Sequence, residues 1–280
     1  MTRTQSAPLA AMAGLTPAAL THAAYGNVVA LWGACCAQLP GAELHDDADV
    51  LWFTTGNTAA PWLNQVLAAR FDDDALDEQI ERALAPFKER RLPMLWSLGP
   101  STRPADLGAR LAGRGLSKVS AMPAMAIDLD ALGDVAMPPA FEVVLVDSDA
   151  AVRTWGDTYI RAFEMPEAPG RVLLDAYARM GFAGDSPARH YVGLLDGEPV
   201  ASATLFIGGG VAGVWHVGTM TNARRQGIGA AMTLAPLQRA RTLGYRVGTL
   251  YASEMGESVY RRLGFVEYGR MEQYQWSPRR

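Results

Sequence analysis

The residues best suited to chemistry form a cationic, glycine-rich run, Arg-Arg-Gln-Gly-Ile-Gly-Ala at 224–230, which follows a strand-like segment and opens a helix-like one. The first backbone N–H groups of a helix have no partner within the helix and point at whatever lies there. Gly227 and Gly229 remove side chains that would hold a phosphate away. Arg224 and Arg225 add positive charge at the same place. The run therefore predicts a binding site for phosphate or pyrophosphate.

Other interpretations of this run stay open. On its own, a glycine-rich turn before a helix is also compatible with a packing role. The run is not a P-loop, because no Gly-Lys-Ser/Thr follows. Met232 stands where a dinucleotide fingerprint needs its third glycine, and no acidic residue follows at 247–248 to bind a ribose. A different phosphate-containing ligand, such as a nucleotide, is therefore an alternative.

A second segment, 247–265, reads as a strand, a short turn and a short helix that Gly264 would end in a left-handed conformation. With both segments in this order, the chain resembles the GCN5-related N-acetyltransferase (GNAT) superfamily. In that family an Arg/Gln-x-x-Gly-x-Gly/Ala turn holds the pyrophosphate of coenzyme A, and a later helix ends in Tyr-x-x-x-Gly-Phe. The matching residues are Arg224, Gly227, Gly229, Tyr260, Gly264 and Phe265.

The resemblance covers residues 141–280 and implies acetyl-CoA as co-substrate, with no metal ion. It implies that the strand before the glycine turn lies along the pantetheine arm and that the N–H groups of the turn hold the pyrophosphate. The coenzyme A-binding residues implied in this way are Val217, Gly218, Thr219, Arg224, Arg225, Gln226, Gly227, Ile228, Gly229 and Ala230.

The resemblance places Tyr260 where it would protonate the leaving thiolate, with a packing role as the alternative. His216 is a candidate general base, because it lies on the strand before the turn and histidine titrates near neutrality. Strand alternation puts positions 216 and 217 on opposite faces, so a buried structural histidine is the other interpretation. A water relay without a dedicated base is a further alternative. Three glutamates are weaker candidates: Glu164, Glu167 and Glu254.

Composition excludes several classes of protein. The net charge of −4 gives no support for nucleic-acid binding. Cys35 and Cys36 are adjacent, so they cannot easily bridge, and two thiols alone make no zinc site. We expect buried thiols in a reducing cytoplasm. The remaining histidines, His22, His45 and His190, show no metal-ligand spacing.

No membrane association is expected from the sequence. No uninterrupted apolar run is long enough to span a bilayer. The first 20 residues lack a basic start followed by a continuous apolar core, so they make a poor signal peptide.

Residues 133–140, with Pro138 and Pro139, predict a boundary between a domain at 1–135 and a domain at 136–280. In the second domain, periodicity and turn signals predict the order β-α-α-β-β-β-α-β-α-β, and Asp196-Gly197 predicts a hairpin. This order matches the acyl-CoA N-acyltransferase (GNAT) fold, an α/β fold with a mixed, mainly antiparallel sheet and flanking helices.

The N-terminal half repeats this pattern in degraded form. Strands are expected at 50–55 and 93–98, and helices at 74–91 and 106–111. Aspartates at 72–74 would repel a pyrophosphate. Leu111 and Leu116 stand where the second half has Tyr260 and Phe265. We therefore expect two tandem GNAT-like domains, the first of them degenerate and non-catalytic, with an unrelated α/β domain as the alternative.

The predicted function is transfer of an acetyl or other acyl group from acetyl-CoA directly to an amine of a small molecule, peptide or protein. A non-catalytic coenzyme A-binding sensor or partner module is the main alternative. The acceptor cannot be read from the sequence, and the chain is compatible with a homodimer. No nucleic-acid or membrane partner is expected.

Overall fold

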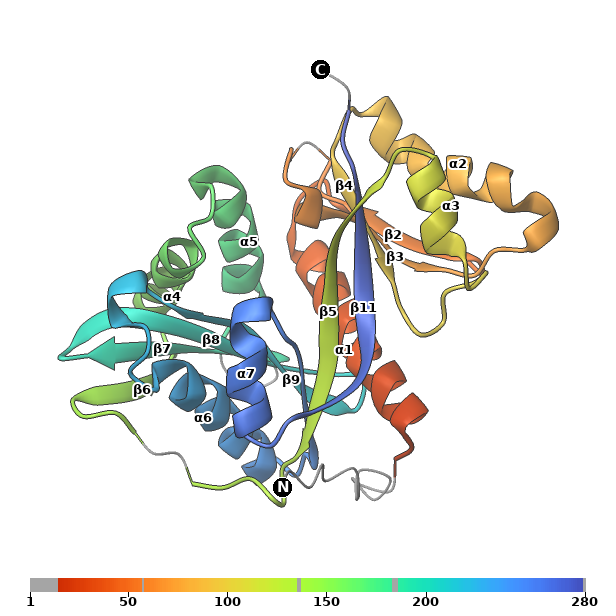
Figure 1. Ribbon diagram of the computed structural model, residues 1–280. Coiled ribbons are helices and arrows are strands. Elements are labelled where there is room, and N and C mark those ends of the chain that lie inside the picture. Colours follow the sequence, from red (N-terminus) through yellow and green to blue (C-terminus); the bar gives the residue numbers. More distant parts are fainter. Residues whose placement is uncertain (1–14, 57, 135–136, 183–185, 279–280) are drawn as a thin grey trace. The chain divides into compact units, whose positions relative to one another are not determined.

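The computed structural model describes residues 15–56, 58–134, 137–182 and 186–278. They divide into two compact units (Figure 1). The large unit combines the chain up to Leu31 with Pro123–Gly269, and the small unit combines Trp32–Met122 with the chain from Arg270. These units are discontinuous in sequence, whereas the expected domains are continuous, so a functional division near residue 135 stays a prediction.

The large unit is built on a mixed, mostly antiparallel sheet. Four strands within residues 141–219 form an antiparallel meander. The strand β10 (Val247–Tyr251) runs parallel to the last of them and antiparallel to β5 (Ser117–Asp128). The expected hairpin at Asp196-Gly197 is present, with φ of 51° and 82° at its two central residues. In hydrogen-bonded order the strands are β5 (Ser117–Asp128), β10 (Val247–Tyr251), β9 (Val211–Thr219), β8 (Glu198–Gly208), β7 (Ala188–Leu195) and β6 (Phe141–Leu145).

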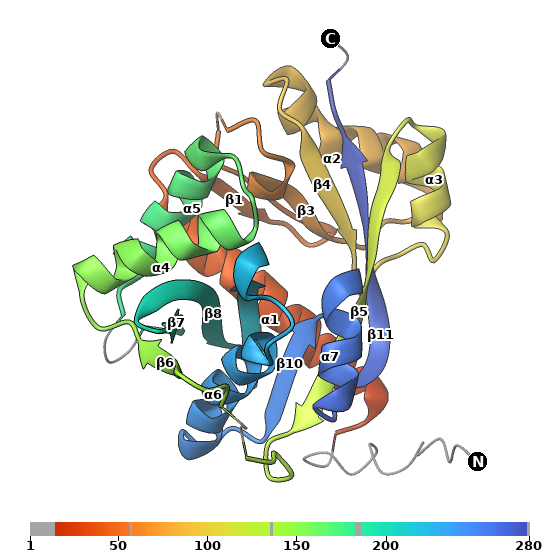
Figure 2. The same cartoon turned by 60° about the vertical axis from the view of Figure 1, so that its left-hand side comes forward.

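Helices cover both faces of this sheet. Figure 2 shows α4 and α6 on opposite sides of β7 and β8. Alternation along β8 explains this, since Ala201, Ala203 and Leu205 pack with α6 in one core, while Ser202 and Thr204 face the other way. The helices, which follow the predicted order, are α4 (Asp149–Ala162), α5 (Glu167–Met180), α6 (Ile228–Thr242) and α7 (Glu254–Arg262).

One long helix, α1 (Pro17–Gln38), has no counterpart among the predicted elements. Its first part belongs to the large unit, where the Asn27 side chain is fully buried. The Asn27 amide donates to the carbonyls of Phe206, Gly208 and Val211 at 3.0–3.4 Å and accepts from Trp215 Nε1 at 2.8 Å. Asn27 therefore satisfies the backbone where β8 turns into β9.

The small unit contains the succession strand, strand, helix, strand, helix. The elements β8, β9, α6, β10 and α7 follow one another in the same order in the large unit. The predicted strands and helices of the N-terminal half are confirmed. Three strands add to them: β1 (Glu43–Asp46), β3 (Asn64–Ala69) and the first part of β5. The hydrogen-bonded order is β1-β2-β3-β4-β11. Its elements are β1 (Glu43–Asp46), β2 (Val50–Thr54), β3 (Asn64–Ala69), α2 (Leu76–Glu89), β4 (Met94–Leu98), α3 (Leu107–Gly113) and β11 (Val266–Trp276), with 3₁₀ turns at Pro61–Leu63 and Asp73–Ala75.

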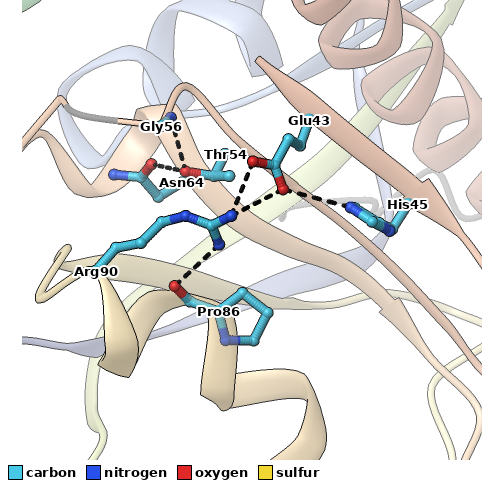
Figure 3. Close-up of polar contacts among 7 residues, drawn as sticks. All are labelled: Glu43, His45, Thr54, Gly56, Asn64, Pro86 and Arg90. Carbon is cyan, nitrogen blue, oxygen red and sulfur yellow. Dashed lines mark hydrogen bonds and ion pairs between the residues drawn. The ribbon is translucent and has the colours of Figure 1, made fainter. Parts of the chain in front are cut away.

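Polar contacts fasten the small unit at two places (Figure 3). Arg90, just after α2, donates to both carboxylate oxygens of Glu43 on β1 at 2.8 and 3.0 Å. His45 lies 3.5 Å from the same carboxylate. Deeper in the unit, Thr54 donates to the buried Asn64 side chain at 2.7 Å. These contacts tie the edge strand and the start of β3 to the rest of the unit.

The closing strand of each half pairs with the other half of the sequence. β5, which ends the N-terminal half, pairs with β10, whereas β11, which ends the chain, pairs with β4. This exchange explains why the compact units do not follow a single boundary in the sequence. In each unit, a short strand that pairs in parallel on one edge thus has an antiparallel partner on the other edge: β10 pairs with β5, and β4 pairs with β11. These pairings satisfy backbone groups on both edges of β10 and β4.

Candidate functional site

The glycine-rich run forms the predicted turn and helix start. A 3₁₀ turn at Thr221–Ala223 follows β9, and α6 begins at Ile228 with Gly227 in the left-handed conformation at φ 82°. The N–H groups of Ala230 and Ala231 donate to the Gly227 carbonyl. The N–H groups of Gly227, Ile228 and Gly229 have no hydrogen-bond partner within the described residues. The start of α6 thus presents free donors, as the sequence predicted.

The two glycines of the turn have different reasons to be glycine. Gly227 has a positive φ, which other residues adopt only at a cost. Gly229 has an ordinary φ, and a Cβ added there would meet no atom within 4 Å. Glycine in a helix costs roughly 0.5–1 kcal/mol relative to alanine. Neither packing nor backbone conformation therefore requires a glycine at position 229.

The two arginines of the turn also differ. Arg224 Nε donates to the Thr219 carbonyl at 2.9 Å, and its Nη2 donates to the Ala162 carbonyl at 3.5 Å. Its guanidinium therefore ties the turn to the end of β9 and the end of α4. Arg225 is exposed and forms no ion pair with the described residues. Arg225 is thus the cation with freedom to meet an anion, while a phosphate contact from Arg224 stays a prediction.

The end of β9 offers an open strand edge. β9 pairs with β10 only through Ala212 and Gly213, which face Gly248 and Thr249. β8 pairs with the other edge of β9 along most of its length. From Val214 to Thr219, β9 therefore has no strand partner on the β10 side within the described residues. This edge leads directly into the turn at 224–230.

A β-bulge interrupts β9 at His216. Ser202 faces Gly218 and Thr204 faces Trp215, so His216 and Val217 together oppose Ala203. The simple alternation expected for 216 and 217 is broken here, and His216 takes a positive φ of 54°. The Ser202 hydroxyl donates to the His216 carbonyl at 3.0 Å. Positive φ is uncommon for a residue other than glycine and concentrates at functional sites.

The His216 ring is half-buried among aromatic side chains of α4 and α5. Its Nε2 lies 2.5 Å from the Tyr177 hydroxyl, and its centroid lies 4.7 Å from the Tyr159 ring. Burial lowers the pKa of His216 to about 3. His190, fully buried beside Trp155, shows the same lowering of its pKa to about 3, first by burial and then by His216. Both rings are therefore neutral at neutral pH.

Tyr260 is brought to the start of α6 by α7. The helix begins at a Ser253 cap and ends in a Schellman motif, in which Phe265 N–H donates to the Tyr260 carbonyl at 3.0 Å and Gly264 has φ 96°. Burial raises the pKa of Tyr260 to about 12, opposed by a hydrogen bond with the Thr233 side chain. Thr233 in turn donates to the Gly229 carbonyl at 2.8 Å.

Gly256 makes room for this tyrosine, since a Cβ there would lie 2.7 Å from the Tyr260 ring. The ring also packs at the margin of the large core, 5.9 Å from Phe265. The structure thus joins Tyr260 to the glycine turn through Thr233. It gives no contact between Tyr260 and His216.

The weaker candidates show no link to the turn. Glu167 pairs with Arg171 on its own helix, and Glu164 and Glu254 are exposed. Cys35 and Cys36 are buried and unbridged, as expected. Within the described ranges, no three metal-binding side chains cluster, and no helix has the length and apolar character needed to cross a bilayer. Tyr177, which lies 2.5 Å from His216, was not singled out from the sequence, because nothing in its helix distinguishes it from a packing tyrosine.

A family comparison covers this region. Residues 152–265 match the model of the acetyltransferase (GNAT) family. No curated protein matches the sequence.

Solved structures show the same fold over most of the chain. A GCN5-related N-acetyltransferase from Kribbella flavida is 22% identical, with a TM-score of 0.68 over 92% of this chain and 96% of the other. One from Sphaerobacter thermophilus is 15% identical, with a TM-score of 0.65 over 95% of each chain.

A tandem GNAT protein from the clavulanic acid biosynthesis pathway is 16% identical, with a TM-score of 0.58 over 86% of this chain and 85% of the other. Its two-domain arrangement agrees with the two repeats described above. The chain therefore has the GNAT fold, and its residues 152–265 match the model of the acetyltransferase (GNAT) family.

Proposed function

We propose that this protein is an N-acyltransferase that moves an acetyl group from acetyl-CoA directly to an amine. The match of residues 152–265 to the acetyltransferase (GNAT) family model supports acyl transfer, and one observation supports the donor. β9 loses its β10 partner after Gly213, and its open edge runs into a turn with free N–H groups at Gly227–Gly229. An extended amide-containing arm that ends in a pyrophosphate fits an open strand edge followed by the start of a helix.

Each predicted binding residue has a place in this proposal. Backbone groups of Val217, Gly218 and Thr219 would bond the pantetheine arm. The N–H groups from Arg225 to Ala230, including those of Gln226 and Ile228, would surround the pyrophosphate, although Ala230 already donates to Gly227. Arg225 would add charge from the surface, and Arg224 would hold the turn in shape.

The proton transfers also fall to this chain's own residues. When bound, acetyl-CoA supplies an activated thioester carbonyl. His216 would take the proton that the amine loses as its nitrogen bonds to the acyl carbon. A pKa of about 3 makes His216 a weak base, so it would hold this proton only briefly before passing it to water. Tyr260 would give its hydroxyl proton to the departing sulfur and recover one from solvent. A pKa of about 12 makes Tyr260 a weak acid, so this donation depends on close contact with the thiolate.

The remaining parts of the proposal concern partners. The acceptor would be an amine of a small molecule, peptide or protein, and the protein would work in the cytoplasm without a metal, nucleic-acid or membrane partner. A homodimer is compatible with these features. A sensor that binds coenzyme A without turnover is the competing function, and an acetylation assay separates the two.

Thermal shift with acetyl-CoA, coenzyme A, ATP and NAD tests the donor site. Gly229→Asp is the sharpest variant, because the added side chain meets open space at an ordinary φ. An aspartate in the first turn should stabilise α6 by about 0.3–1 kcal/mol while repelling a pyrophosphate. Gly113→Asp, at a helix position with equally open space in the small unit, is the matched control.

We expect acetyl-CoA at about 100 times its Kd to stabilise the wild type and Gly113→Asp by about 2.7 kcal/mol. Gly229→Asp should show no response, although its own melting temperature is not lowered. A response to ATP or NAD but to no coenzyme A species would overturn the proposal.

A further inference from the structure

We propose that Tyr177 is a positioning residue for His216: its hydroxyl oxygen accepts the Nε2–H of the ring and leaves Nδ1 open toward the amine acceptor. This inference rests on the proposed acyl transfer, because it assigns the atom of His216 that would meet the acceptor. It adds to that proposal a residue, Tyr177, that the sequence did not single out.

The first support is the geometry of the pair. The Tyr177 oxygen and His216 Nε2 are 2.5 Å apart, a short hydrogen bond. Tyr177 is almost completely buried on α5, so its hydroxyl has little freedom to turn away. The two rings meet edge to face with centroids 5.3 Å apart. The bond therefore fixes both the rotation of the imidazole and the nitrogen that points into the protein.

The second support is the backbone at His216. The left-handed φ of 54° and the bulge turn this residue out of the regular alternation of β9. A positive φ at a non-glycine residue is unfavourable unless its surroundings hold it. The surroundings do so here, since Ser202 bonds its carbonyl and Tyr177 bonds its ring.

The third support is the location of the ring. His216 stands within Val214–Thr219, the part of β9 whose edge has no β10 partner. Nδ1 has no hydrogen-bond partner among the described residues, and the side chain is only half-buried. His190 provides the contrast: it is fully buried, and its Nδ1 is bonded to Thr204 at 2.9 Å.

These facts assign different duties to the two nitrogens of His216. Nε2–H donates to Tyr177 and anchors the ring. Nδ1 keeps its lone pair and takes the proton of the attacking amine while the new nitrogen–carbon bond forms, and the proton then passes to water. The opposite tautomer, with hydrogen on Nδ1, would present a donor to the acceptor and could not remove its proton.

The tautomer can be read directly from the full chain labelled with ¹⁵N-histidine. The protein has four histidines, so a long-range ¹H–¹⁵N correlation spectrum is simple, and His216→Gln assigns the signals of interest. At neutral pH we expect His216 to show a protonated Nε2 and an unprotonated Nδ1. A protonated Nδ1 in the wild type would overturn the proposal, whatever the protein's activity.

Two variants with the same chemical change complete the test. Tyr177→Phe should shift the His216 signals toward a mixture of tautomers while leaving those of His190 in place. Tyr191→Phe is the control, because its buried hydroxyl has no partner within the described chain. It should leave both histidines unchanged.

An unchanged His216 spectrum in Tyr177→Phe would also overturn the proposal. The thermal response to acetyl-CoA should survive in Tyr177→Phe, since Tyr177 lies on α5 and bonds the His216 ring rather than forming part of the glycine turn. Loss of the Nε2-protonated form of His216 is thereby distinguished from loss of acetyl-CoA binding at the proposed donor site.

Discussion

The two halves of this chain share the same order of strands and helices, but they differ in the residues at the strand edge and at the start of the following helix. In the large unit β9 and β10 form two parallel pairs, at Ala212–Gly213, and then separate. In the small unit β3 and β4 likewise form two parallel pairs, at Gln65–Val66. Beyond these pairs, the backbone of Arg103 takes the place beside β3: Arg103 N–H donates to the Ala69 carbonyl, and Phe71 N–H donates to the Arg103 carbonyl.

The helix starts differ in the same sense. α6 begins with glycines and free N–H groups, whereas aspartates precede α2 and continue into its first turn. The surface hollow beside α2 is lined by four carboxylates and one arginine: Asp73, Asp74, Asp77, Glu78 and Arg110. Carboxylates complement the positive end of a helix and repel an anion. In the small unit, the backbone of Arg103 therefore fills the strand edge, and aspartates fill the space at the start of the helix.

The shared part of the plan extends to the last helix of each half. Leu116 N–H donates to the Leu111 carbonyl after α3, just as Phe265 N–H donates to the Tyr260 carbonyl after α7. Gly115 and Gly264 both have positive φ. The same glycine turn is therefore present after α3, although Leu111 there lacks the hydroxyl of Tyr260. The glycine at this turn thus has a role in the fold that does not depend on catalysis.

The largest difference expected between the halves is at this last helix. Tyr260→Phe should lower kcat about 100-fold or more with little change in stability, since a general acid contributes about 10²–10⁴. Leu111→Ala should instead cost about 2–5 kcal/mol of stability, because Leu111 is fully buried. Steady-state acetylation and urea unfolding of both variants measure this. Equal effects of both on stability, with unchanged kcat for Tyr260→Phe, would remove the catalytic role of that tyrosine.

A second comparison uses one buried asparagine from each unit. Asn27 and Asn64 each donate hydrogen bonds to three backbone carbonyls. Replacing either with alanine should cost about 2–3 kcal/mol, since buried groups are left unsatisfied. Only Asn27→Ala should also weaken acetyl-CoA binding, because Asn27 holds Trp215 on β9. Calorimetry with both variants tests this, and weakened binding in Asn64→Ala would argue against a donor site confined to the large unit.

A third comparison concerns acid. Burial lowers the pKa of His190 from 6.5 to about 3, so below the unfolded value the unfolded chain binds a proton that the folded chain refuses. Stability should therefore fall as pH drops from 7, by about 2 kcal/mol for this group at about pH 5. Urea unfolding of wild type and His190→Asn at both pH values checks the direction. His45→Asn, at an exposed site in the small unit, is the control and should keep the acid sensitivity of the wild type.

The smallest effect expected is at two glycines with open surroundings. Gly229→Ala and Gly113→Ala should each stabilise the fold by about 0.4–1 kcal/mol. Only Gly229→Ala should weaken acetyl-CoA binding, because its methyl group enters the space before the turn. If both variants bind as the wild type does, the space at Gly229 has no ligand role.

Much of the large unit could be predicted from local signals. The hairpin at Asp196-Gly197, the glycine stop at Gly264 and the periodic helices depend on neighbouring residues, and all are present. α1 could not be predicted in this way. Its sequence is apolar on nearly every side, so it shows no helical periodicity, and its burial depends on Asn27 and a distant hairpin.

The exchange of β5 and β11 was also beyond local reasoning, because a strand's sequence does not state which edge it joins. At the site, the turn and Tyr260 follow from motifs. The hydrogen bonds of Arg224 to the backbone and the bond between Tyr177 and His216 depend on how the chain folds. The partners have no fixed spacing in the sequence, so no sequence motif predicts either contact.

Isothermal titration with acetyl-CoA tests the contrast between the two units most directly. We predict one binding site per chain, absent in Gly229→Asp and retained in Gly113→Asp. Two sites per chain, or a site that survives in Gly229→Asp, would contradict the account.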